Sequence, residues 1–337
     1  MAGLAGLTPP ADFAELIALA PLSPTHFRSL AHPFRPGAAR GVFGGHLLAQ
    51  SLYAAALTVP DRYICNSLQS HFLTANSDVV PFEYRVELVR DGSTYIIRHV
   101  NVYQHLSQSI NDLTLVYTCM VSFKLSEALH EPVLYSASQV RNQHCSERWA
   151  HAPKPPDIGL DPEDCPPVPD VDLPIWIKWA TASDSDFTQI IHAVDVRRAE
   201  DKLLALPDQF SERKMYHFYR TALPLSDDPN IHLAAHIYTS DRNSLFISAR
   251  LINKINNVHR VASLSHMIIF YPPSRPHKGT AVRADKGWCM MESHTNRSGD
   301  GRIGYSGKLY DQDGEMFADF IQDGLCRFGE SHLKSSL

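Results

Sequence analysis

Two stretches of this sequence decide the expected fold because they nearly repeat each other: Asn66-Ser67-Leu68-Gln69-Ser70-His71 and Val261-Ala262-Ser263-Leu264-Ser265-His266. A proline follows each stretch at a similar distance. A glycine turn comes next, at Asp91-Gly92 in the first half and at Lys286-Gly287 in the second. A unit that occurs twice in one chain indicates a duplicated domain. One copy can then carry the chemistry while the other contributes only packing.

The length agrees with two domains, since 337 residues exceed the roughly 100–200 residues of a typical domain. A net charge of -5 argues against a nucleic-acid partner, which usually requires a basic face. No apolar run reaches the roughly 18 residues that span a bilayer, and residues 1–20 lack the basic residues of a signal peptide. We therefore expect a cytoplasmic protein with no membrane span.

The cysteines are scattered and form no C-x-x-C pair, so we expect free thiols packed as small hydrophobic groups rather than a zinc site. The chain also lacks metal-ligand spacing, a P-loop and a dinucleotide-binding glycine pattern. The expectation is therefore that the protein uses neither a metal nor a cofactor. The six cysteines are Cys65, Cys119, Cys145, Cys165, Cys289 and Cys326.

The first half predicts one buried helix and several antiparallel strands. Residues 46–57, which follow Gly44-Gly45, are rich in alanine and leucine, which favour helix, and apolar residues cover most faces of this helix. Apolar and polar residues alternate within 82–89, as in a half-buried strand, and Asp91-Gly92 is a strong hairpin signal. This order indicates a curved sheet wrapped around a central helix. The expected strands are 67–73, 82–89, 95–103 and 113–123.

The second half predicts the same order. Ser240-Asp241 is expected to begin a helix that runs to about residue 251, because Ser and Asp are preferred helix N-caps. Asp313-Gly314 predicts another hairpin turn. The expected strands are 187–197, 214–222, 260–271, 279–292, 301–310 and 315–327.

A proline-rich segment separates the halves. Eight prolines fall between residues 153 and 174, and such a run is extended and cannot form a central strand. We therefore predict a first domain at 1–125, a linker at 126–185, a second domain at 186–330 and a C-terminal tail at 331–337.

Five short motifs, in order along the chain, resemble those of the type II acyl-CoA thioesterases. The resemblance implies an α+β fold with two tandem hotdog domains, each an antiparallel sheet wrapped around a central helix. It also implies hydrolysis of an acyl-CoA to a free acid and CoA by direct attack of an activated water. The motifs are Arg40-Gly41-Val42-Phe43-Gly44-Gly45-His46-Leu47-Leu48-Ala49-Gln50, Arg90-Asp91-Gly92-Ser93, Ser240-Asp241-Arg242-Asn243, Ala262-Ser263-Leu264-Ser265-His266 and Gln322-Asp323-Gly324.

The same resemblance implies that Asp241, Ser263 and Gln322 form the water-activating triad. A carboxylate can take a proton from a water within hydrogen-bond reach, and a hydroxyl and an amide can hold that water. Each residue also has a plain structural alternative. Asp241 can serve only as a helix N-cap, Ser263 as an ordinary strand serine, and Gln322 as a solvent-facing strand residue.

Gly44, Gly45, His46 and His71 are the expected substrate-binding residues. Backbone N–H groups at a helix N-terminus can receive the negative charge that develops on the thioester oxygen. His46 stands where the family usually has glutamine, and Ser265 stands where it usually has aspartate. These departures leave the acyl-chain preference open, and each histidine can instead be a packed core residue.

Two other functions stay open alongside simple acyl-CoA hydrolysis. The protein can be a thioesterase dedicated to a specialised biosynthetic acyl thioester, or a non-catalytic acyl-thioester binding module. A serine hydrolase is disfavoured because the G-x-S-x-G elbow is missing. The tail Ser335-Ser336-Leu337 resembles a peroxisomal S-K-L signal without its basic residue, so the peroxisome is the alternative location. We also expect a homo-oligomer.

Overall fold

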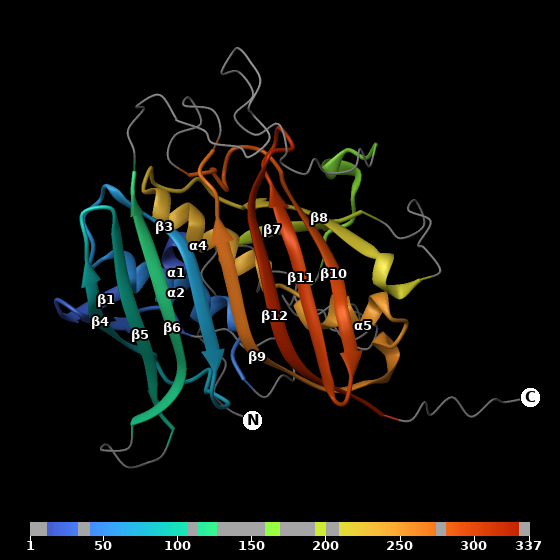
Figure 1. Ribbon diagram of the computed structural model, residues 1–337, viewed down its shortest axis with the longest axis horizontal. Coiled ribbons are helices and arrows are strands. Elements are labelled where there is room, and N and C mark those ends of the chain that lie inside the picture. Colours follow the sequence, from blue (N-terminus) through green and yellow to red (C-terminus); the bar gives the residue numbers. More distant parts are fainter. Residues whose placement is uncertain are drawn as a thin grey trace, which may run out of the picture.

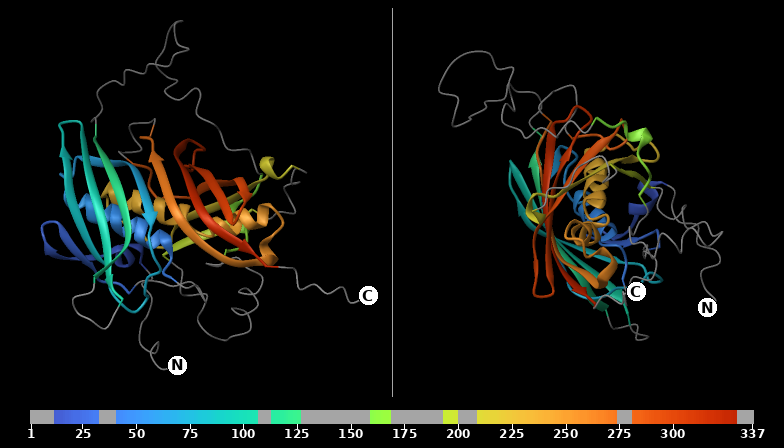
Figure 2. Two further views of the ribbon diagram at one scale, coloured as in Figure 1. Left: turned by 60° about the horizontal axis from the view of Figure 1, so that its bottom comes forward. Right: turned by 90° about the vertical axis from the view of Figure 1, so that its right-hand side faces the viewer.

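The computed structural model describes residues 12–32, 41–106, 113–126, 159–168, 193–199, 209–273 and 281–329. Within these ranges, the strands form a single antiparallel sheet in the order β1-β2-β4-β5-β6-β3-β9-β12-β11-β10-β8-β7. Figure 1 shows this sheet in front of the helices, and Figure 2 shows it curving around them. The antiparallel sheet wrapped around helices confirms the α+β class.

The first half supplies the helices and strands up to residue 125. The helix predicted at 46–57 and the four predicted strands are all present; the helix begins two residues earlier, at Gly44, and the strand ends differ by a few residues. The elements are α1 (Phe13–Ile17), β1 (Leu19–Ser23), β2 (His26–Ser29), α2 (Gly44–Ala56), β3 (Tyr63–Phe72), β4 (Glu83–Asp91), β5 (Tyr95–His105) and β6 (Leu113–Leu125).

The second half repeats the arrangement, with a central helix and an antiparallel sheet. Its elements are β7 (Val194–Arg198), β8 (Lys214–Thr221), α4 (Pro229–Ser240), α5 (Ser244–Leu251), β9 (Val258–Phe270), β10 (Cys289–Gly299), β11 (Arg302–Tyr310) and β12 (Met316–Phe328). Three short 3-10 turns lie at η1 (Pro162–Asp164), η3 (Phe210–Glu212) and η4 (Ile255–Asn257).

The two repeated stretches lie side by side at the centre of the sheet. β3 pairs with β9 antiparallel, and Gln69 lies opposite Met267. The repeat therefore lies in the strands through which the two hotdog units join edge to edge, but its residues are not structural equivalents, because the bulges in β3 and β9 align Ser263 with Cys65 rather than with Ser67. Most of the predicted linker lies outside the described residues, so the domain boundaries at 125 and 186 stay predictions.

Three expectations about the second half are wrong. The helix predicted from Ser240-Asp241 to about residue 251 starts later, as α5 at Ser244. A separate helix that was not predicted, α4, ends at Ser240, and Asn243 lies between the two at a φ of 57°. Asp241 is thus the C-cap of α4. The N-cap of α4 is Asp228, whose carboxylate accepts from the Asn230 N–H at 2.9 Å. The sequence around Asp241 suggests an N-cap because an aspartate beside a serine can lie in a turn at either end of a helix.

The strand predicted at 279–292 lies too early in the chain. Residues 281–288 form no strand, and β10 begins at Cys289. The repeated glycine turns are also not equivalent: Asp91-Gly92 joins β4 to β5, whereas Lys286-Gly287 precedes β10. The hairpin that corresponds to Asp91-Gly92 is Asp300-Gly301, between β10 and β11. Of the strand predicted at 187–197, residues 187–192 lie outside the described residues.

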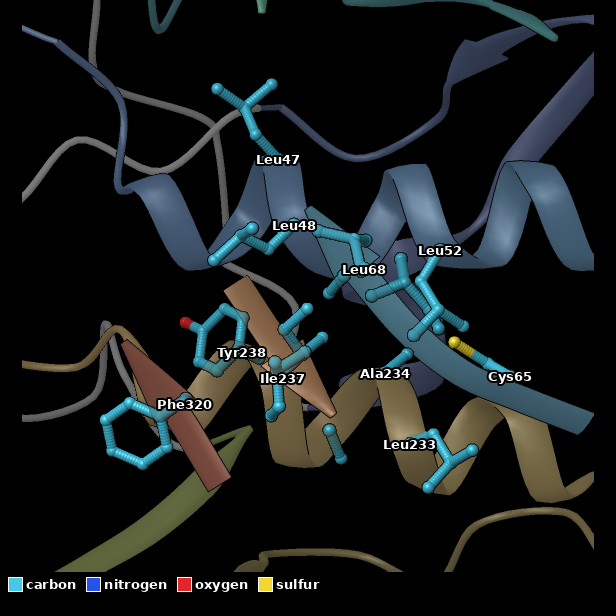
Figure 3. Close-up of a cluster of buried hydrophobic side chains, with 14 of the residues drawn as sticks. Leu47, Leu48, Leu52, Cys65, Leu68, Leu233, Ala234, Ile237, Tyr238 and Phe320 are labelled. Carbon is cyan, nitrogen blue, oxygen red and sulfur yellow. The ribbon is translucent and has the colours of Figure 1, made fainter. Parts of the chain in front are cut away.

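The core lies between the sheet and the antiparallel pair α2 and α4. Leu48 and Leu52 of α2 face Ala234 and Ile237 of α4, and Leu68 of β3 packs beside them (Figure 3). All of these side chains are buried. Burying one leucine-sized side chain contributes about 1.5–3 kcal/mol, so this contact is a principal source of stability. The described cysteines are free and buried, as expected.

Candidate active site

Asp241 lies where the ends of the two central helices meet. It follows the last residue of α4, and α2 begins nearby with Gly44 and Gly45. A carboxylate at a helix C-terminus is normally unfavourable, because that end of the helix carries partial negative charge. Here the N-terminus of α2 supplies the opposite charge, and the backbone N–H of Gly45 donates to Asp241. The antiparallel packing of the helices therefore creates the environment of this carboxylate.

Gly44 and Gly45 allow this close approach. A Cβ at Gly44 would lie 2.6 Å from Oδ2 of Asp241, and a Cβ at Gly45 would lie 2.6 Å from the carbonyl oxygen of Tyr238. Real Cβ atoms do not come so close to oxygen. The pair is needed at the start of α2 because any side chain there would push the two helix ends apart.

Gln322 links the three residues of the predicted triad. Its Nε2 donates to Oγ of Ser263 at 2.7 Å, and its side chain also hydrogen bonds to Asp241. The contact with Ser263 depends on a bulge between β9 and β12, where Leu264 has no partner and Ser263 lies opposite Gly324. The structure thus brings Asp241, Ser263 and Gln322 together from three separate elements.

Burial raises the pKa of Asp241 to about 7. The hydrogen bonds from Gln322, Ser244 and the Gly45 N–H oppose this shift because they stabilise the ionised form. Oγ of Ser244 donates to Oδ1 at 3.2 Å. A carboxyl group with a pKa near neutrality is suited to accept and return a proton at physiological pH.

Two further buried residues, which sequence reasoning did not select, continue the network. Nδ1 of His266 lies 3.1 Å from Oε1 of Gln322, and Nε2 lies 3.0 Å from Oγ of Ser240. Both residues lie within the motifs described above: Ser240 directly precedes Asp241, and His266 follows Ser263 by three residues. This closeness to the predicted triad is the sequence signal that could have identified them. Burial lowers the pKa of His266 to about 4, which keeps the ring neutral.

The structure does not place the two predicted histidines, His46 and His71, beside Asp241. His71 is exposed on β3, opposite Ser265, and strand alternation puts it on the face of the sheet that points away from the helices. His46 is fully buried in the first turn of α2, 6.1 Å from the ring of Phe82. Neither ring nitrogen of His46 has a hydrogen bond of good geometry, and burial lowers its pKa to about 4. Their roles in substrate binding stay predictions.

Within the described ranges, no helix is long and apolar enough to cross a membrane. The same residues contain no group of three or more His, Cys, Asp or Glu side chains placed to hold a metal ion.

Comparison with known proteins covers most of the chain. Residues 31–124 match the family model of the acyl-CoA thioesterase N-terminal domain, and residues 162–326 match that of the C-terminal domain. The chain is 24% identical to acyl-coenzyme A thioesterase 8 of Homo sapiens over 324 residues, which are 95% of this chain and 91% of that protein. It is also 24% identical to acyl-CoA thioesterase 2 of Haemophilus influenzae over 297 residues, which are 86% and 89% of the two chains.

A shorter match and a solved structure agree. The chain is 32% identical to peroxisomal acyl-coenzyme A thioester hydrolase 1 of Saccharomyces cerevisiae over 117 residues, which are 35% of this chain and 32% of that protein. The crystal structure of an acyl-CoA thioesterase II, TesB2, from Mycobacterium marinum aligns with a TM-score of 0.64 and 26% identity. That alignment covers 94% of this chain and 99% of the other.

Proposed function

This chain belongs to the acyl-CoA thioesterase family and hydrolyses acyl-CoA thioesters, and we propose that Asp241 activates the attacking water while Ser263 and Gln322 hold it. The observation that carries the proposal is the single amide of Gln322, which hydrogen bonds both to Ser263 and to a buried carboxylate whose pKa lies near 7. A water at this point meets a proton acceptor and two groups that fix its orientation.

The proposed reaction balances without a covalent intermediate. Ionised Asp241 takes one proton from water as the oxygen attacks the thioester carbon. The carbon–sulfur bond then breaks, and protonated Asp241 returns its proton to the departing CoA sulfur. The products are the free acid and CoA, and Asp241 is ionised again.

The N-terminus of α2 completes the proposed site. Its partial positive charge points at Asp241 from Gly44 and Gly45, so a thioester carbonyl bound there develops its negative charge beside helix N–H groups. Removing one donor of this kind typically costs about 10²–10³ in rate in other enzymes.

The principal test compares thiol release by the native enzyme and Asp241→Asn across a panel of acyl-CoA chain lengths. The variant keeps the shape of the side chain but cannot take a proton, so we expect kcat to fall by about 10²-fold or more. Asp319→Asn is the matched control. That carboxylate lies on the neighbouring β12 and accepts from the Tyr271 hydroxyl at 3.0 Å, so its loss should change kcat less than about twofold. Unchanged turnover in Asp241→Asn, with its fold intact, would remove Asp241 from the mechanism.

Direct attack by water is tested separately by a single turnover in ¹⁸O-labelled water. We expect all of the product acid to carry one ¹⁸O atom. If the acyl group first formed an anhydride with Asp241 and water attacked the Asp241 carbonyl, the product acid would take its second oxygen from Asp241 and carry no ¹⁸O, and the direct mechanism would be wrong.

The acyl-CoA panel also addresses the two alternatives from the sequence. Release of thiol from simple acyl-CoAs is the expected outcome. Hydrolysis of none of them, with activity on a structurally specialised acyl thioester, would indicate the dedicated biosynthetic role. Tight binding with no release at any chain length would favour the binding module.

We further propose a homo-oligomer and a cytoplasmic location, with the peroxisome as the alternative. Light scattering of the purified chain tests the first. Microscopy of a tagged protein with and without residues 335–337, which lie outside the described residues, tests the second. A peroxisomal signal that disappears on deletion would overturn the cytoplasmic assignment.

A further inference from the structure

Three side chains, Ser240, His266 and Gln322, form a directed hydrogen-bond chain that leads to Ser263 and Asp241. Ser240 contacts Nε2 of His266, Nδ1 of His266 contacts Oε1 of Gln322, and Nε2 of Gln322 contacts Ser263. The side chains of Ser240, His266 and Gln322 are almost entirely buried, with exposed fractions of 0%, 1% and 1%. Water cannot easily replace any link, so each bond has to be satisfied by its neighbour in the chain.

The direction of each bond follows from which atoms carry protons. A side-chain amide oxygen can only accept, so Nδ1 of His266 must donate to Oε1 of Gln322. Because the ring is neutral, Nε2 is then an acceptor and needs a donor. The hydroxyl of Ser240 lies 3.0 Å from Nε2, but its single proton is also donated to the carbonyl oxygen of Ile237 at 2.8 Å, so the two acceptors share it. The imidazole therefore has one tautomer in this arrangement, assigned from the network.

The direction of the chain determines which atoms of Gln322 face the carboxylate. With Oε1 held by His266, both protons of Nε2 point toward Ser263 and Asp241. Rotating the amide by 180° would place its oxygen against Asp241, which is unfavourable while that carboxylate is ionised. The ionised carboxylate is the form that the proposed mechanism requires.

We propose that His266, oriented by Ser240, is a positioning residue that holds the amide of Gln322 with its N–H groups toward Ser263 and Asp241. The proposal rests on the triad role given to Gln322 and Asp241. His266 is well placed for this task because it lies directly opposite Gln322 in the β9–β12 register and stacks on Phe320, with ring centroids 5.9 Å apart. Its backbone carbonyl also accepts from Oγ of Ser70, which ties its position to β3 of the first half.

The test replaces His266 in two ways and measures kcat against pH. His266→Leu removes the donor, so we expect kcat to fall about tenfold with KM changed less than about twofold. His266→Leu should also raise the pH at which kcat increases, because a Gln322 amide that His266 no longer holds does not stabilise ionised Asp241. Tyr305 of β11 also faces Asp241, but burial raises the pKa of this phenol and keeps it neutral in both proteins. His266→Asn, whose Nδ2 can donate from the place of Nδ1, should recover most of the rate.

A double-mutant comparison separates this role from simple packing. In a Gln322→Ala background, His266→Leu should cost less than about twofold, because the group on which it acts is gone. Ser240→Ala should lower kcat a few-fold in the native background and have no further effect in Gln322→Ala. This second variant decides the question if His266→Leu fails to fold.

The outcomes distinguish two failures. If Gln322→Ala is as active as the native enzyme, the proposed triad is wrong. If Gln322→Ala is impaired but the His266→Leu and Ser240→Ala effects multiply with it, or if His266→Asn is no better than His266→Leu, the triad stands and the positioning role is wrong.

Discussion

The two halves of the sheet have the same bulge, but only the second half surrounds it with polar side chains. Asn66 is unpaired between β3 and β6, and Leu264 is unpaired between β9 and β12. Aligning the two bulges, and the two helix C-caps, gives four polar residues around the candidate site an apolar counterpart in the first half. The aligned pairs are Ser263 with Cys65, His266 with Leu68, Gln322 with Val121 and Asp241 with Leu57.

The starts of the two central helices, α2 and α4, also differ. At the start of α2, Gly44 and Gly45 leave room for a carboxylate. At the start of α4, the side chain of Asn230 fills the corresponding space. Its Oδ1 accepts from the Cys65 N–H at 2.9 Å, and its Nδ2 donates to the Tyr63 carbonyl oxygen at 3.1 Å. The start of α4 is therefore tied to β3 by a side chain, whereas the start of α2 presents glycines to Asp241.

A buried arginine, Arg98, is a further difference between the first half and the second. The strand registers align Arg98, opposite Val121, with Tyr305, opposite Gln322. Arg98 donates to the hydroxyl and carbonyl of Thr58, just after α2, and pairs with Asp91 at 2.6 Å. A cation at the C-terminus of α2 is favourable, and it stands where the second half has a carboxylate at the C-terminus of α4. Duplication thus produced two similar folds: the second supplies the polar side chains of the candidate site, and the first contributes the start of α2.

The largest expected effect on kcat comes from replacing Gln322 with valine, the residue at the aligned position of the first half, Val121. Gln322→Val should lower kcat by about 10²-fold, about 2.7 kcal/mol, because Asp241 and Ser263 lose their shared donor. Steady-state hydrolysis of a good acyl-CoA substrate measures it. Val121→Gln is the reciprocal control and should leave kcat unchanged within about twofold, since no carboxylate lies beside it. A Gln322→Val enzyme of native activity would contradict the comparison.

The second effect concerns the pH dependence of stability. Since burial raises the folded-state pKa of Asp241 to about 7, the unfolded chain loses this proton first as the pH rises above about 4. Its contribution to the free energy of unfolding therefore falls between about pH 4 and pH 7, by an amount on the order of 4 kcal/mol. Chemical denaturation of the native protein and Asp241→Asn at several pH values measures the difference between them. A pH-independent difference would show that the carboxyl group is not perturbed.

The same pKa predicts that kcat rises as the pH increases through about 7, since ionised Asp241 is the proposed base.

The third effect tests the role of the first half. Arg98→Met should destabilise the fold by about 2 kcal/mol, because the Thr58 and Asp91 groups lose a charged, buried donor. Thermal or denaturant unfolding measures the loss. The kcat of the folded fraction should be unchanged. A loss of kcat without a loss of stability would show that Arg98 contributes to turnover rather than to the stability of the first half.

The smallest effect comes from a single methyl group at the helix end. Gly44→Ala should lower kcat about tenfold, about 1.4 kcal/mol, because its Cβ would lie 2.6 Å from Oδ2 of Asp241 and displace it. Gly304→Ala, where the nearest atom is 3.5 Å away, is the matched control with little expected change. Equal activities of the two variants would mean that the close approach of α2 to Asp241 is not needed for turnover.

Local sequence signals predict much of the architecture. The central helix α2 is rich in alanine and leucine, and the alternation in β4 and the Asp91-Gly92 turn indicate a hairpin, so local signals agree there. The helix α4 was missed because its residues 229–240 include two histidines, a threonine and a serine with no apolar stripe. Nearly all of it is buried, so its helical form depends on packing rather than on propensity.

The sequence by itself determined the duplication, the family motifs and the identities of Asp241, Ser263 and Gln322, because these features consist of residue types and their order along the chain. Only the tertiary structure decided that Asp241 ends one helix and faces the start of another, that Gln322 joins it to Ser263, and that His266 and Ser240 support this link. Those relations depend on antiparallel helix packing and on a bulge between two strands. Both bring together atoms that are far apart in the sequence, where no local pattern records their distance.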